Sequence, residues 1–327
     1  MSTTPPALRA WAPDGVPEVR GDDDLVALLL DALAAGPDMP KLADGDVVVV
    51  TSKVVAKAEG RVRASTREAE LPGETLRMVA RRGATAIVRN RLGLTMAAAG
   101  IDGSNVEPGH VVLLPLDPDA SARRLRAGIA ERTGVTVGVL VSDTAGRAWR
   151  EGQTDIAVGA AGMVVAESFA GRTDEHGNEL VVTAPAVADE LAALAELATG
   201  KLGGRPFTVV RGRADLVLPL EEDGPGARSL IRAEGQDFFG YGAREAVLRA
   251  LAGREADRAP FGAPASPEEL VAAVAEATGG LGVLDDGEVA VSGADPTALA
   301  ALAFAFGWSV ETSGARGSVA RLRPVTT

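Results

Sequence analysis

The sequence predicts a mixed α/β fold of the α+β kind, with a small α/β unit appended at the carboxyl end. Short valine-rich apolar runs alternate with segments of helical periodicity along the first three-quarters of the chain. A Pro-, Gly- and Ala-rich stretch at residues 259–265 interrupts this alternation, as a linker would. With 327 residues, 46% of them hydrophobic, the chain can bury one large core and one small one.

The elements follow from the apolar pattern in chain order. Strands are predicted at 47–51, 85–89, 111–114, 135–141, 156–158 and 206–210, and helices at 22–35, 74–82, 119–132 and 184–198. The last part reads as a helix at 267–278, a strand at 288–292, a helix at 295–306 and two short strands ending near Leu322. We therefore divide the chain into a domain at 1–245 and a small accessory domain at 246–327.

A polar stretch from Ser142 to Asp155 directly follows the apolar run 135–141. We predict that it is a loop at the carboxyl end of a buried strand, where α/β enzymes keep their chemistry. Asp143 and Thr144 offer the hard oxygen ligands that suit Mg²⁺ or Mn²⁺. Taken alone, the Asp-Thr pair could equally cap a helix.

Two further segments add polar groups at turns and strand ends. Asp102 and Asn105 lie in a Gly-rich turn, which by itself is an ordinary loop composition. The strand 47–51 runs directly into Ser52, and a lysine at 57 follows. Three clusters of basic residues either bind an anion or form ordinary solvated surface. They are Lys53, Lys57, Arg61 and Arg63; Arg81, Arg82, Arg89 and Arg91; and Arg147 with Arg150.

No Gly-x-Gly-x-x-Gly follows the first predicted strand, and no Gly-x-x-x-x-Gly-Lys occurs, so a nucleotide site would be assembled from dispersed loops.

The chain resembles the coenzyme F420-0:γ-glutamyl ligase family in the order of eight segments. They are 15–19, 51–61, 90–94, 99–105, 142–155, 177–180, 188–190 and 209–212. The likeness spans about residues 10–245. It is strongest to the amino-terminal ligase domain of the bifunctional actinobacterial members.

The resemblance implies roles for individual positions. Val16, Pro17, Glu18 and Val19 would line the guanine nucleotide, with Val16 in place of the usual leucine. Ser52, Lys57 and Asn105 would contact the nucleotide, the first two at its phosphates. Asp102 and Asp143 would bind one divalent cation and Thr144 a second. Asp102, Asp143 and Lys57 are the expected catalytic groups, and a cation clamp on phosphates is also what these residue types favour chemically.

The resemblance also implies a reaction. A GTP-dependent ligase would activate coenzyme F420-0 as an acyl phosphate and add L-glutamate, giving F420-1 and longer forms and releasing GDP and phosphate. Mg²⁺ or Mn²⁺ would occupy two sites, K⁺ is a further allowed cation, and a homodimer is expected. Two alternatives stay open, a related amide ligase that uses another amino acid and a catalytically silent nucleotide- and metal-binding regulator.

Composition excludes several classes of function. The net charge of −12 argues against nucleic acid as a partner. The absence of cysteine excludes disulfides and thiolate sites, and with no apolar run of about 18 residues we expect no membrane span and a cytoplasmic location. The last 80 or so residues are too few for the nitroreductase-like domain of longer relatives, so we expect no FMN.

Overall fold

The computed structural model describes residues 7–233, 236–237, 239–312 and 319–325. It divides into two compact units. The first comprises Met1–Arg77 and Ile87–Ile231, and the second comprises Met78–Ala86 and Arg232–Thr327. The predicted mixed α/β class is confirmed.

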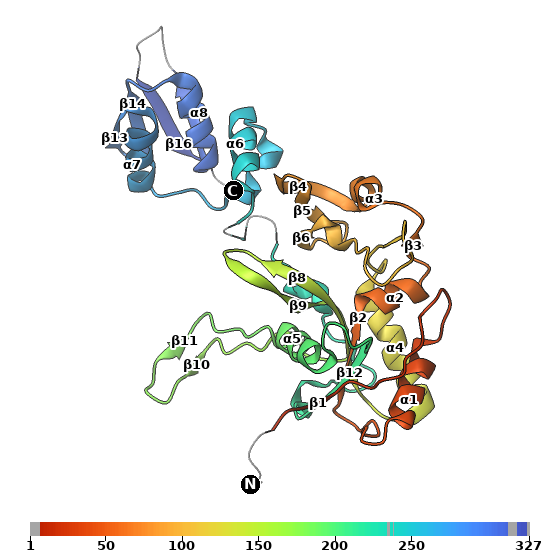
Figure 1. Cartoon of the computed structure of the whole chain (residues 1–327). Coiled ribbons are helices and arrows are strands. Elements are labelled where there is room, and N and C mark those ends of the chain that lie inside the picture. The colour runs from red at the N-terminus through yellow and green to blue at the C-terminus, as the bar shows by residue number, and fades with distance from the viewer. Residues whose placement is uncertain (1–6, 234–235, 238, 313–318, 326–327) are drawn as a thin grey trace. The chain divides into compact units, whose positions relative to one another are not determined.

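The main sheet of the first unit has the strand order β1-β12-β2-β8-β9 (Figure 1). Its strands are β1 Arg9–Trp11, β12 Phe207–Arg211, β2 Val47–Thr51, β8 Gly138–Arg147 and β9 Arg150–Ala161. β2 and β8 are parallel, and the other neighbours are antiparallel. Since Thr51 pairs with Ser142, β2 and β8 carry their carboxyl-terminal residues to the same edge of the sheet.

Helices cover both faces of this sheet. α1 Leu25–Ala35 and α4 Pro118–Thr133 pack on the face that presents Val48, Val50 and Val139. α5 Val187–Thr199 packs on the opposite face, against Val47, Val49 and Leu140. Burial on both faces explains the unbroken valine run of β2, because neither set of alternating side chains meets water. Each fully buried valine or leucine contributes about 1.5–3 kcal/mol to stability.

Short elements complete the first unit around the sheet. They are α2 Ser52–Ala58, β3 Val62–Arg63, α3 Arg67–Glu74, β6 Thr95–Ala97, β7 Val111–Val112, β10 Arg172–Thr173, β11 Glu179–Leu180 and the 3₁₀ turns at 98–100, 214–216 and 227–230. β3 pairs with β7, and β10 with β11. β4 Thr75–Arg82 and β5 Thr85–Asn90 form a sheet of order β4-β5-β6, and the chain passes between the units along these strands.

The predicted helix at 74–82 is wrong, because residues 75–82 form strand β4 and Glu74 ends a helix that precedes it. The helix lies immediately before it, as α3, where the Thr66 hydroxyl accepts a hydrogen bond from the Ala69 amide. The apolar residues Leu76, Met78 and Ala80 alternate with other residues, which is the period of a strand. Pairing with the neighbouring β5 settles the choice.

The second unit contains α6 Ala243–Ala252, α7 Pro267–Thr278, β13 Leu281–Asp285, β14 Glu288–Ser292, α8 Pro296–Ala305, β15 Trp308–Thr312 and β16 Ala320–Pro324, with 3₁₀ turns at 255–257 and 259–261. The antiparallel sheet has the order β13-β14-β16-β15. α7 and α8 pack Leu270, Val274 and Leu299 against it. The predicted helix at 267–278 and strand at 288–292 are confirmed, and the helix at 295–306 is found at 296–305. In the described ranges, the model has no helix both long and apolar enough to cross a membrane.

Candidate active site

The stretch from Ser142 to Asp155 is a β-hairpin, not the loop that the sequence predicts. β8 continues through the polar residues to Arg147, and β9 returns from Arg150. The register pairs Asp143 with Ile156 and Thr144 with Asp155. Pairing across the hairpin supplies the backbone hydrogen bonds that keep this polar segment extended.

This extended backbone places two adjacent candidate ligands on opposite faces. Directly paired residues share a face of a sheet. Asp143 lies opposite Ile156, which packs on the core beneath α1 and α4, whereas Ser142 lies opposite Ala157, which belongs to the core beneath α5. Alternation along the strand therefore directs Asp143 to the α1 and α4 side and Thr144 to the α5 side.

Asp143 meets the start of α2. The Ser52 hydroxyl donates a hydrogen bond to Asp143 Oδ1 over 2.9 Å. Burial and, to a smaller degree, the negative charges of Asp155 and Asp102 raise the pKa of Asp143 to about 7, against the lowering effect of the hydrogen bond from Ser52. Negative charge therefore accumulates around Asp143, as it does where a cation binds.

Asp102 is held at the same side by a lysine. Lys53 Nζ lies 2.6 Å from Asp102 Oδ2, and the backbone amide of Ser104 donates to Asp102 Oδ1 over 2.7 Å. Burial acts to raise the pKa of Asp102, but the hydrogen bonds from Lys53 and Ser104 leave that pKa below its usual value. The chain around Asp102 is fixed by backbone hydrogen bonds exchanged with Val112 of β7.

Lys57 joins three distant segments. Its side chain is buried, and its ammonium forms an ion pair with Glu18 and donates to the Asn105 carbonyl over 2.6 Å. Asn105 takes a left-handed conformation with φ of 55°, which asparagine tolerates better than most residues. The structure therefore brings the candidates Glu18, Lys57 and Asn105 together.

The other candidates of the 16–19 segment differ from Glu18 in their burial and contacts. Val19 is 4% exposed and belongs to the core beneath α1 and α4. Val16 packs on the edge of that core, and Pro17 is exposed. Within this segment, Glu18 is the residue whose side chain contacts Lys57.

On the α5 side, Thr144 contacts two charged groups. Its hydroxyl donates to Asp155 Oδ1 over 2.8 Å and accepts from Lys201 Nζ over 2.9 Å. Ser142 donates to the other carboxylate oxygen of Asp155 over 2.9 Å. Lys201 also forms an ion pair with Glu196 at 3.6 Å. Sequence reasoning missed Lys201, because it lies alone in a turn after α5 and only the folded chain brings it to the hairpin.

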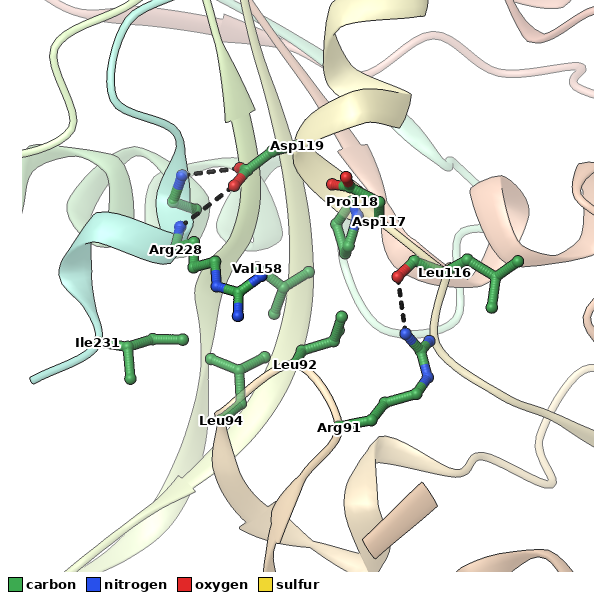
Figure 2. Close-up of a pocket in the computed structure, with 11 residues that line it drawn as sticks. Arg91, Leu92, Leu94, Leu116, Asp117, Pro118, Asp119, Val158, Arg228 and Ile231 are labelled. Carbon is green, nitrogen blue, oxygen red and sulfur yellow. Dashed lines mark hydrogen bonds between the residues drawn. The ribbon is translucent and has the colours of Figure 1, made fainter. Parts of the chain in front are cut away.

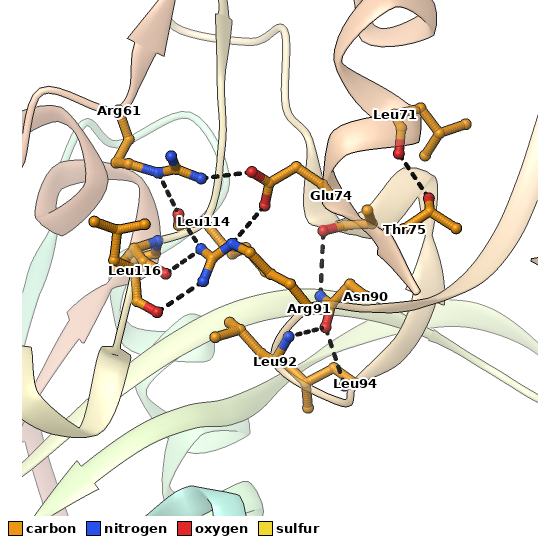
Figure 3. A network of polar contacts seen from close by, with 12 residues as sticks. Arg61, Leu71, Glu74, Thr75, Asn90, Arg91, Leu92, Leu94, Leu114 and Leu116 are labelled. Atoms are coloured by element: carbon orange, nitrogen blue, oxygen red, sulfur yellow. Dashed lines mark hydrogen bonds and ion pairs between the residues drawn. The ribbon is translucent and has the colours of Figure 1, made fainter. Parts of the chain in front are cut away.

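Two of the arginines proposed to bind an anion form hydrogen bonds and ion pairs within the protein instead. Arg61 and Arg91 each donate to Glu74 over 2.7 Å, one to each carboxylate oxygen (Figure 3). Both also bind the Leu114 carbonyl. These contacts hold the segments around α3, β5 and β7 together, so both guanidinium groups already have partners within the fold and one carboxylate offsets part of their charge.

A small pocket lies on the side of the sheet that Asp143 faces. Its volume is about 130 Å³. Val158, two residues along β9 from Ile156, lines it on that face, and the Arg228 guanidinium extends across it (Figure 2). The Asp119 carboxylate fixes the wall by accepting from the amides of Ala160 and Ala227, each over 2.8 Å.

The donors around Asp143 fit a magnesium-like ion. Asp102, Asp143 and Ser52 present oxygen ligands, and the carboxylates repel one another. Over the described residues, the structure has no group of three or more His, Asp or Glu side chains that could hold a metal by themselves. Mg²⁺ commonly uses one or two carboxylates together with waters and substrate phosphates, so a pair of aspartates suffices when a nucleotide supplies the rest.

Comparison with known proteins places the chain among similar sequences of one family. The family model described as F420-0:Gamma-glutamyl ligase matches residues 15–212. A Coenzyme F420:L-glutamate ligase from Archaeoglobus fulgidus is 40% identical over 247 residues, which are 69% of this chain and 94% of the relative. Relatives of the same name from Methanopyrus kandleri and Halobacterium salinarum are each 38% identical, over 68% and 71% of this chain and 93% and 95% of their own lengths.

Proposed function

The chain belongs to the F420-0:Gamma-glutamyl ligase family, and from this membership we propose how it acts as a coenzyme F420:L-glutamate ligase. Such an enzyme is a ligase that forms a carbon–nitrogen bond. The observation that carries the assignment is the 40% identity over nearly the whole of a relative with that name. The convergence of Glu18, Lys57 and Asn105 supports it, because the three come from separate matched segments.

The proposed reaction has two steps. A carboxylate does not react with an amine at neutral pH, so the carboxylate of F420-0 first attacks the γ-phosphorus of GTP, and GDP leaves. The amine of L-glutamate then attacks the carbonyl carbon of this acyl phosphate, loses a proton and expels phosphate. The product holds a new amide, and one GTP is consumed for each bond.

The residues would divide this work by position. Lys57 would place its ammonium against nucleotide phosphates, exchanging its contact with Glu18 or the Asn105 carbonyl for phosphate oxygens. Ser52, at the first position of α2, would donate to the same phosphates. Asp102 and Asp143 would hold a divalent cation, which when bound neutralises charge on the transferred phosphoryl group.

Several finer features belong to the same proposal. GTP as the nucleotide, a homodimer and a particular kinship with the actinobacterial ligase domains rest on the sequence resemblance, and a cytoplasmic location rests on the apolar pattern of the sequence. The division into a ligase domain at 1–245 and an accessory domain at 246–327 rests on the end of the resemblance near residue 245 and on the Ala-, Gly- and Pro-rich composition that follows, including the linker-like stretch at 259–265.

Mass spectrometry of the product tests the function directly. The full-length protein is incubated with F420-0, GTP, Mg²⁺ and L-glutamate, and a product heavier by one or more glutamyl residues is expected, with stoichiometric GDP. Parallel reactions with other amino acids separate a glutamate ligase from an amide ligase of different specificity. Absence of any adduct, with GTP bound but unchanged, would favour the silent regulator.

A further inference from the structure

The surroundings of Thr144 do not fit the second divalent cation that the resemblance implies there. A hydroxyl offers one donor and two lone pairs. The Thr144 proton is given to Asp155 at 2.8 Å, and one lone pair receives the Lys201 ammonium at 2.9 Å. A positive charge therefore already lies against this neutral oxygen and uses one of the two lone pairs with which it could bind a metal.

Asp155 cannot readily supply a replacement ligand. It is 5% exposed, and its two carboxylate oxygens accept from Ser142 and Thr144. Across the described ranges, Asp155 has no ion-pair partner within the usual 4 Å limit. The Lys201 ammonium, which donates to the same Thr144 hydroxyl, therefore balances the negative charge of Asp155. A doubly charged ion at this place would lie beside the ammonium and be repelled by it.

The fold holds Lys201 in this position. α5 ends at Thr199, and Gly200 follows with φ of 65°, a conformation that turns the chain away from the helix axis. Glu196, one turn before the end of α5, pairs with the Lys201 ammonium at 3.6 Å. The lysine is thus directed to the hairpin from a fixed helix end, although its side chain is 66% exposed and open to a ligand.

We propose that the Lys201 ammonium takes the place of the second cation, so that this enzyme binds one divalent cation per active site. The proposal rests on the proposed function, because it assumes that a nucleotide and a cation at Asp102 and Asp143 meet near Thr144. An ammonium has three N–H donors, and Thr144 uses one of them. The others face solvent or Glu196 and can bind phosphate oxygens as a point charge.

Electron paramagnetic resonance of Mn²⁺ tests this directly. The full-length protein is titrated with Mn²⁺ in the presence of a non-hydrolysable GTP analogue. The parent is expected to bind one Mn²⁺ per subunit, with the spectrum of an isolated ion. Lys201→Gln removes the charge and supplies a neutral oxygen ligand, so it is expected to bind two Mn²⁺ as a spin-coupled pair. The matched control Lys201→Arg keeps the charge and should remain at one.

The outcomes separate this proposal from the proposed function. A spin-coupled pair in the parent would overturn the role of Lys201 and leave the ligase assignment standing. A Lys201→Gln variant that stays at one Mn²⁺ and binds the analogue as tightly as the parent would also overturn it. Identical Mn²⁺ titrations of the parent and Asp143→Asn would instead show that the cation site of the proposed function is misplaced.

Discussion

At the scale of single residues, the site is a set of charges that the protein has only partly balanced. Lys53 neutralises Asp102, and Lys57 pairs with Glu18, while Asp143 accepts hydrogen bonds from the Ser52 hydroxyl and the Thr144 backbone, which carry no charge. Its pKa of about 7 follows from burial first and from neighbouring carboxylates second. A bound cation would therefore meet the Asp143 carboxylate already held in place by the Ser52 hydroxyl.

Replacing Asp143 by asparagine separates charge from shape. Asp143→Asn keeps the size and can still accept from Ser52, so we expect an unchanged or slightly higher melting temperature. Activity should fall by about a hundredfold or more, because the cation loses a charged ligand. Steady-state rates at several Mg²⁺ concentrations check this. Near-parental turnover with the same Mg²⁺ dependence would refute a ligand role.

Lys57→Ala should affect both binding and stability. The lysine is 5% exposed, so its loss leaves Glu18 and the Asn105 carbonyl without this donor and costs about 1–3 kcal/mol of stability. GTP affinity should fall by about tenfold to a hundredfold, as expected for a lost charge-assisted hydrogen bond. Calorimetric titration with GTP measures this, and Lys57→Arg is the control that retains charge. Equal affinities in all three proteins would exclude a phosphate contact.

At the scale of elements, local signals explain what the sequence could and could not predict. α7 was predicted to the residue because Ser266 and Glu269 form a capping box and Gly279 ends the helix. The sequence predicts a helix where β4 forms and a loop where the β8–β9 hairpin forms. Both predictions fail because strand formation at these places depends on pairing with another strand, which the local sequence does not show. The roles of Lys201 and of the Arg61, Glu74 and Arg91 contacts depend on residues far apart in sequence, which periodicity does not reveal.

A buried arginine of α4 offers a test of how one element is fixed to the rest. Arg126 is 2% exposed and donates to the carbonyls of Val137, Leu218, Pro219, Leu220 and Glu222. Arg126→Lys keeps the charge but has too few donors in the wrong geometry. We expect a loss of about 2–4 kcal/mol, since each unsatisfied carbonyl costs about 1–3 kcal/mol. Urea unfolding measures it, and Arg123→Lys on the same helix, where the side chain is 41% exposed, should change little.

At the scale of the whole molecule, the candidate site and the carboxyl-terminal sheet belong to different compact units. Residues 18, 52, 57, 102, 105, 143 and 144 all fall in the first unit, and the β13-β14-β16-β15 sheet falls in the second. The second unit has its own core, formed by residues such as Leu270, Trp308 and Leu322. The chemistry should therefore not require that sheet.

Deleting residues 259–327 should leave a soluble dimer that still makes the glutamyl amide. α6 loses its neighbour α8 in this truncation, so a lower melting temperature is expected. Gel filtration and product mass spectrometry check both points. Cleavage of the folded full-length protein at a protease site inserted within 259–265 provides a control that does not depend on the fragment folding alone. A soluble fragment that binds GTP and Mg²⁺ but makes no amide would show that the removed part completes the site.

The purified full-length protein should carry no flavin. The described residues of the second unit form a four-stranded antiparallel sheet with helices. An absorption spectrum of the purified protein and of the supernatant after heat denaturation checks this, with added FMN as the positive control. Flavin released in proportion to protein would mean that the second unit has a binding role.

The strand order of the main sheet has a consequence for protein synthesis. β12 lies between β1 and β2, and β1 pairs in this sheet with β12 alone. The ribosome releases Arg9–Trp11 about 200 residues before Phe207–Arg211, so β1 must wait for a partner that is made long afterwards. β1 is therefore made long before it can join the sheet. A ribosome that stalls before residue 207 would leave β1 without its partner and one edge of β2 unpaired, and such exposed strand edges are prone to aggregation and are bound by chaperones.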